Sequence, residues 1–138
     1  MASLTHLAET SALSRLRHPS VSKALLPLAK QDALARCTYS DLEIGFSARN
    51  AREWDDLHRA LRAFAAVDVL PQDYARACGV QRALAAAGLK GRKVPDLVVA
   101  AAAEREELTL LHYDHDFDLI SDMTGQSCGW VVPRGSVD

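Results

Sequence analysis

The sequence predicts an α/β fold built on a mainly parallel sheet of four or five strands. Along the chain, short extended runs alternate with longer amphipathic segments, and this alternation is typical of parallel sheets that helices cover on both faces. The length of 138 residues suits one compact domain, so we expect residues 1–138 to form a single domain. With 49% hydrophobic residues, such a domain can form a core without disulfides or a structural metal.

Five short segments have the composition of strands, because each is a mainly apolar run next to turn residues or the start of a helix. The expected strands are residues 4–8, 34–38, 66–70, 108–112 and 129–132. The fourth segment is the clearest, since its apolar run ends directly at acidic residues. The second is weaker, which is why we expect four or five strands.

The segments between these strands have the three- and four-residue apolar spacing of helices. The expected helices are residues 11–17, 19–30, 39–49, 51–65, 71–87, 97–106 and 117–123. Ser40 is followed by Glu43 at the spacing of a capping box, so we expect Ser40 to cap its helix. We also expect one apolar helical face to be buried, and it consists of Trp54, Leu57, Leu61 and Phe64.

The composition excludes several classes of protein. Cys37, Cys78 and Cys128 are an odd set without the short spacing of a disulfide framework or a zinc site. We therefore expect a reducing compartment, the cytoplasm. The longest apolar run, residues 97–103, is too short to cross a bilayer, so we expect no membrane association. A net charge of −2 does not by itself indicate a nucleic-acid-binding protein.

Acidic residues recur where a parallel sheet would gather them. Glu9 follows the first expected strand, and Asp114 and Asp116 follow the fourth. Asp96 begins a helix, and Glu43 lies in the first turns of the helix after the second strand. Because ligands of such sheets lie beyond the carboxyl ends of the strands, we expect these acids at one edge.

Each of these acids alone has an ordinary explanation, as a helix cap, an acidic turn or part of a solvated helix face. Together they indicate a pocket in which carboxylates repel one another unless a cation is present. Carboxylate oxygens are hard ligands that suit Mg²⁺ or Mn²⁺. The pattern therefore predicts a divalent metal site.

Four motifs occur in the order and at the separation of a known family. They are LAETSAL at residues 7–13, TYSDLEIGFSAR at 38–49, VPDLVVAA at 94–101 and LHYDHDF at 111–117. On these motifs the chain resembles, along nearly its whole length, the PIN-domain VapC toxins of bacterial VapBC toxin–antitoxin pairs. The resemblance implies a PIN-like three-layer α/β/α fold and a metal-dependent endoribonuclease.

The resemblance also implies particular residues and partners. The catalytic acids map onto Glu9, Glu43, Asp96, Asp114 and Asp116. Of these, Glu9, Asp96 and Asp114 are the expected ligands of Mg²⁺, or of Mn²⁺ in its place. The hydroxyl of Thr10 or Ser11 would orient the first carboxylate. The implied partners are an RNA substrate, a VapB-like antitoxin and a second copy of the chain in a homodimer.

One position departs from the family pattern, because Glu9 stands where the family has aspartate. The additional methylene extends the carboxylate by about 1.5 Å, whereas Mg²⁺ requires near-ideal octahedral geometry. We therefore hypothesise that Glu9 shifts the ion relative to its other ligands and weakens RNA cleavage.

The sequence leaves two alternatives open. The chain could be a catalytically inactive PIN-fold binding protein, with Glu9 marking the lost activity. It could also be a phosphatase that uses Asp114 as nucleophile and Asp116 as acid, although position 118 is Asp rather than the Thr usual for such a motif. A further expectation concerns the basic residues beside Asp96, which we predict to form an RNA-contacting rim: Lys90, Arg92 and Lys93.

Overall fold

The computed structural model describes residues 3–89 and 91–138, and its centre is a five-stranded sheet in which every pairing is parallel. The strand order is β3-β2-β1-β4-β5. The strands are β1 His6–Ala8, β2 Leu34–Cys37, β3 Ala65–Val67, β4 Thr109–His112 and β5 Cys128–Trp130. The α/β class and the mainly parallel sheet are confirmed, and all five expected strands form, several of them shorter than expected.

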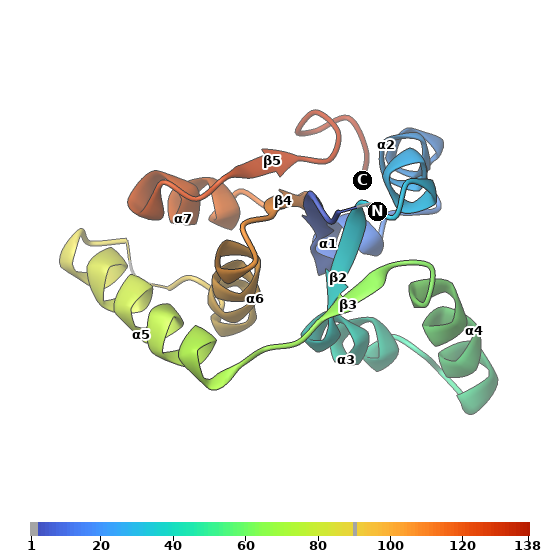
Figure 1. Ribbon diagram of the computed structural model, residues 1–138, viewed down its shortest axis with the longest axis horizontal. Coiled ribbons are helices and arrows are strands. Elements are labelled where there is room, and N and C mark those ends of the chain that lie inside the picture. Colours follow the sequence, from blue (N-terminus) through green and yellow to red (C-terminus); the bar gives the residue numbers. More distant parts are fainter. Residues whose placement is uncertain (1–2, 90) are drawn as a thin grey trace.

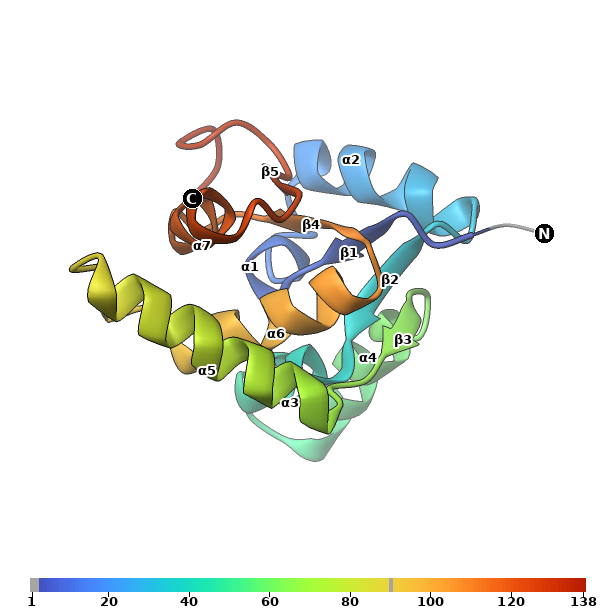
Figure 2. The ribbon, with the colours of Figure 1, turned by 60° about the vertical axis from the view of Figure 1, so that its left-hand side comes forward.

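Helices cover both faces of this sheet (Figures 1 and 2). They are α1 Thr10–Leu13, α2 Pro19–Lys30, α3 Thr38–Phe46, α4 Ala51–Leu61, α5 Pro71–Ala86, α6 Val94–Arg105 and α7 Asp116–Thr124. Neighbouring strand residues point to opposite faces, so Leu7 joins the core under α5, α6 and α7, whereas Ala8 joins the core under α1 and α2. None of the described helices has the length and apolar composition of a membrane span.

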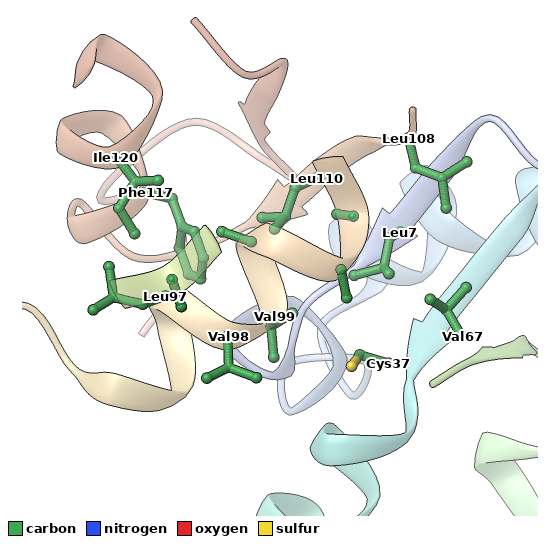
Figure 3. Packing of buried hydrophobic residues seen from close by; sticks show 14 of the residues in the cluster. Leu7, Cys37, Val67, Leu97, Val98, Val99, Leu108, Leu110, Phe117 and Ile120 are labelled. Atoms are coloured by element: carbon green, nitrogen blue, oxygen red, sulfur yellow. The ribbon is translucent and has the colours of Figure 1, made fainter. Parts of the chain in front are cut away.

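Helix α6 is the central element of the larger core (Figure 3). Its residues from Leu97 to Ala103 are all buried, and it packs against α5, α7 and the sheet. A helix that is apolar on every side is expected in such a buried position. The alanines allow close approach of its neighbours, and the helix begins at Val94, three residues before the expected start.

Two local expectations are wrong. Helix α3 begins at Thr38 after Cys37, so Ser40 lies buried inside the helix rather than capping it. Its hydroxyl lies 2.8 Å from Thr10 Oγ1. The buried Ser40 side chain therefore has its hydrogen-bonding partner on the neighbouring helix α1. Trp54 is not buried either, since it is 47% exposed and its ring stacks on His58 with centroids 3.7 Å apart. Leu61 and Phe64 are buried as expected.

A buried ion pair joins the start of α5 to the end of α6. Asp73 is almost fully buried, and its carboxylate accepts the backbone N–H of Leu70 at 2.8 Å. Arg105 donates to both Asp73 oxygens, at 2.9 and 3.1 Å, and to the Asp68 carbonyl at 2.8 Å. This cluster fixes the connection between β3 and α5 against the end of α6.

We predict that Arg105→Met destabilises the protein by about 3 kcal/mol, because it leaves the Asp73 carboxylate buried without its cation. Chemical denaturation measures the free energy of unfolding. The control is Arg76→Met, which removes the more exposed ion pair with Glu104 and should cost only about 0–1 kcal/mol. Equal losses in the two variants would contradict this account.

Candidate metal centre

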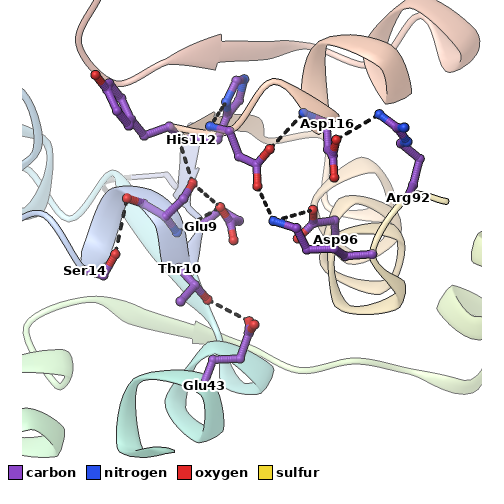
Figure 4. Close-up of polar contacts among 12 residues, drawn as sticks. Glu9, Thr10, Ser14, Glu43, Arg92, Asp96, His112 and Asp116 are labelled. Atoms are coloured by element: carbon purple, nitrogen blue, oxygen red, sulfur yellow. Dashed lines mark hydrogen bonds and ion pairs between the residues drawn. The ribbon is translucent and has the colours of Figure 1, made fainter. Parts of the chain in front are cut away.

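Acidic side chains gather at the carboxyl edge of the sheet, around the ends of β1 and β4 (Figure 4). Glu9 directly follows β1 and caps α1, and Asp114 follows β4 with one residue between them. Asp116 is the first residue of α7, and Asp96 lies in the first turn of α6. The parallel topology thus brings together acids that are far apart in the sequence, as the sequence analysis expects.

Three of these carboxylates form one compact group, which we call the acidic triad: Asp96, Asp114 and Asp116. Each offers an oxygen, and the three oxygens lie within 4.8 Å of one another. The backbone N–H of Asp116 donates to Asp114 Oδ1 at 2.9 Å, which fixes one carboxylate relative to the next. Asp96 is buried, and its Oδ2 atom has no hydrogen-bond partner among the described residues. A buried carboxylate group with an oxygen that accepts no hydrogen bond, close to two more carboxylates, fits a hard divalent ion.

Electrostatics at the acidic triad favour a bound cation. Burial, together with the negative charge of Glu9, raises the pKa of the Asp96 carboxyl to about 7. Burial also raises the pKa of Glu9 to about 7, although hydrogen bonds from Ser11 oppose the rise. Both shifts show that negative charge is unfavourable here without compensation, and a divalent cation would supply that compensation.

Ser11 orients the first carboxylate, as the resemblance implies. Its backbone N–H donates to Glu9 Oε1 at 2.9 Å, and its hydroxyl donates to the same oxygen. The Ser11 oxygen in turn accepts the backbone N–H of Tyr113 at 2.7 Å. One serine therefore ties the end of β1 to the end of β4. Glu9 lies outside the acidic triad, and its role as a metal ligand stays a prediction.

Glu43 is held at the margin of the site by the other predicted hydroxyl. Thr10 Oγ1 donates to Glu43 Oε1 at 2.8 Å, and this contact joins α1 to α3. Glu43 also lies outside the acidic triad, although its charge contributes to the raised pKa of Glu9. The structure thus brings all five predicted acids to one edge but gathers three of them closely.

Basic residues of the predicted rim point inward. Lys93 Nζ lies 2.6 Å from Asp114 Oδ2, and Arg92 NH1 lies 2.9 Å from Asp116 Oδ1. Burial would raise the pKa of Asp114, but the hydrogen bonds from Lys93 and from the Asp116 backbone outweigh it, and this pKa is lowered. The same contact raises the pKa of Lys93. Lys90, the third predicted rim residue, lies outside the described residues.

His112 is a residue of the site that the sequence analysis does not name. It is fully buried, and its Nδ1 accepts the backbone N–H of Asp114 at 3.2 Å. Its ring packs against Phe117 and Trp130, with centroids 5.1 Å away in each case. Burial lowers the pKa of His112, so the neutral ring can accept this bond. Its position in the sequence, as the last residue of the strand before Asp114, could have indicated a role next to the acids.

Comparison with known proteins gives relatives along nearly the whole chain. A family model described as the PIN domain matches residues 7–122. Ribonuclease VapC51 of Mycobacterium tuberculosis is 50% identical over 135 residues, which cover 98% of this chain and 98% of that protein. Ribonuclease VapC18 of the same species is 39% identical over 132 residues, covering 94% of this chain and 96% of the relative.

Solved structures show the same fold at lower sequence identity. VapBC2 from Rickettsia felis, bound to a DNA fragment from its promoter, contains a chain with a TM-score of 0.77 and 16% identity. The match covers 91% of this chain and 98% of that one. DNA-bound VapBC from Salmonella typhimurium gives a TM-score of 0.76 at 12% identity, covering 94% and 99%. At such identities the likeness establishes the fold alone.

We predict that the chain binds Mn²⁺ and that Asp96→Asn weakens this binding by roughly tenfold or more, because a buried anionic ligand is lost. Isothermal titration calorimetry of the purified protein measures the affinity. Asp122→Asn, which removes an exposed acid of α7, is the matched control and should bind like the parent. An unchanged affinity in Asp96→Asn would refute the assignment of Asp96.

Proposed function

This chain belongs to the PIN-domain family, in the branch of the VapC ribonucleases, and on that premise we propose that it is the toxin of a type II toxin–antitoxin pair and hydrolyses RNA phosphodiester bonds. The observation that supports this most strongly is the acidic triad, with three carboxylate oxygens within 4.8 Å of one another and no hydrogen bond to Asp96 Oδ2 among the described residues. Such a site has the chemistry of a metal-dependent endoribonuclease.

In this proposal the acidic triad holds Mg²⁺, or Mn²⁺ in its place, and Glu9 is a further ligand beside it. When bound, such an ion supplies activation of water and compensation of charge on the scissile phosphate. The surrounding residues orient the acids. Ser11 holds Glu9 Oε1, and Thr10 holds Glu43. His112 fixes the backbone of Asp114.

Glu9 supports the hypothesis of attenuated cleavage. One of its oxygens accepts both the N–H and the O–H of Ser11, and the carboxylate lies outside the acidic triad. The Glu9 carboxylate is therefore held by its hydrogen bonds at the start of α1. Its side chain is also one methylene longer than that of the aspartate usual in the family. Geometry that is off by about 1 Å can cost on the order of a hundredfold in rate.

We predict that the chain cleaves RNA in Mg²⁺, that chelation with EDTA stops cleavage, and that Asp114→Asn lowers the rate of cleavage on the order of a hundredfold.

We also predict that Glu9→Asp raises the rate of cleavage, because the shorter side chain would no longer displace the ion. Initial rates on a mixed cellular RNA at fixed Mg²⁺ measure these effects, with Asp122→Asn as control. A chain that binds Mn²⁺ but cleaves no RNA, even as Glu9→Asp, would instead support the inactive binding protein. Equal rates for Glu9→Asp and the parent would disprove attenuation.

The proposed partners are a VapB-like antitoxin and a second copy of the chain, in the cytoplasm. Helix α3 exposes large apolar side chains next to the site: Phe46 is 92% exposed, and Leu42 is also exposed. Together with Tyr39 and Glu43 they line a shallow hollow. Exposed apolar groups of this size are typical of interfaces. An antitoxin arginine that entered the acidic pocket beside this surface would exclude the ion.

We expect Phe46→Asp to weaken capture of the antitoxin encoded by the neighbouring gene, because the substitution places a charge in an apolar contact. Co-purification from cells that express both proteins measures capture, and light scattering of the toxin alone measures its mass. Arg59→Met on exposed α4 is the control. A toxin that remains monomeric would contradict the homodimer, and full capture by Phe46→Asp would exclude this surface.

A further inference from the structure

The acidic triad has two cationic partners, Arg92 and Lys93, and both come from the segment just before α6. Lys93 Nζ lies 2.6 Å from Asp114 Oδ2 and 4.0 Å from Asp96 Oδ2. Arg92 NH1 lies 2.9 Å from Asp116 Oδ1. Each carboxylate of the triad therefore has a positive side chain within 4.0 Å. These contacts offset part of the repulsion among the three acids.

The two cations differ in exposure. The side chains of Arg92 and Asp116 are 22% and 19% exposed, so their ion pair is largely shielded from water. The Lys93 side chain is 61% exposed. An ammonium ion on a flexible, solvated stem is held weakly, whereas a guanidinium in a partly buried pair is held more firmly. Of the two cations, Lys93 is therefore the one that another cation can more easily replace at the acidic triad.

The backbone limits how such an exchange can occur. Lys93 is the residue that precedes the first turn of α6, and Asp96 lies three residues further on. Pro95 restricts the backbone between them. The Lys93 carbonyl also accepts the backbone N–H of Leu97 at 3.3 Å, which ties the main chain of Lys93 to the start of α6. The side chain is therefore the part of Lys93 that can leave the acidic triad most easily. The exposed ammonium group has a direct path into solvent.

We propose that Lys93 is a resident counter-ion of the acidic triad, which a divalent ion must displace from Asp114 Oδ2 in order to bind. Asp114 Oδ2 cannot hold an ammonium ion at 2.6 Å and a divalent ion together without strong repulsion between the two cations. Lys93 therefore sets the metal affinity of the site. This inference rests on the metal site of the proposed function, but not on RNA cleavage.

The first test measures metal affinity without RNA. Mn²⁺ binding to the full chain, followed by electron paramagnetic resonance, should be about fivefold tighter in Lys93→Met than in the parent, since an exposed ion pair no longer opposes binding. Lys93→Arg keeps the charge and should bind like the parent. Lys23→Met removes an exposed lysine of α2 and controls for net charge. If Lys93→Met does not fold, Lys93→Gln replaces it.

The second test observes the displacement itself. In ¹⁵N-labelled protein, the ammonium signal of Lys93 is identified by its absence from Lys93→Met. Saturating Mg²⁺ should move this signal towards those of the exposed Lys23 and Lys30. A Lys93 signal that stays in place, or affinities of the parent and Lys93→Met within twofold of each other, would overturn the proposal. Displacement of Lys93 without RNA cleavage would leave it standing and contradict the proposed function.

Discussion

Mutual repulsion of the carboxylates in the acidic triad is the constraint around which the site is organised. Three oxygens within 4.8 Å, one of them on buried Asp96, cannot all be charged at low cost. The chain offsets this in two ways. Lys93 and Arg92 contribute positive charge, and the backbone N–H of Asp116 satisfies one oxygen of Asp114. Burial first, and then the charges of Glu9, Asp114 and Asp116, still raise the pKa of Asp96 to about 7.

The fold maintains this unfavourable arrangement by burying the elements that carry the acids. Asp96 is fixed by α6, whose apolar body fills the larger core. Asp114 follows a strand that is paired on both sides, and His112 holds its backbone from within the core. Ser11 joins the ends of β1 and β4. Because these supports are packed and hydrogen-bonded, the main chain cannot easily move to separate the acids and relieve their repulsion.

Much of this could be predicted from the sequence, because topology decides it. Strands that alternate with helices form a parallel sheet, so acids that follow strands, such as Glu9 and Asp114, reach the same edge whatever the details of packing. The first turn of α6 places Asp96 there by the same reasoning. Which acids gather most closely was not predictable, since the additional methylene of Glu9 and its bond to Ser11 act over only a few ångströms.

Side-chain direction explains the remaining differences. Ser40 has the spacing of a cap, but α3 begins earlier and its hydroxyl meets Thr10. Trp54 has the spacing of a core residue, but it lies at the margin of the apolar face and stacks on His58. Lys93 and Arg92 were expected to face RNA, yet both turn towards the acidic triad. The spacing of apolar residues predicts which face of a helix is buried. It does not predict which neighbouring group a long or polar side chain will contact.

The burial of α6 has a consequence for how such a site can change during evolution. Asp96 is buried and directly precedes the part of α6, residues Leu97 to Ala103, that is buried on every side, so its position can drift only if several neighbours change together. Lys93, just before the same helix, is exposed and can be replaced without disturbing the core. One segment thus combines an acid whose position the core holds with a neighbour that a single substitution can change. Selection can adjust that neighbour in single steps while the geometry of the acids is inherited intact.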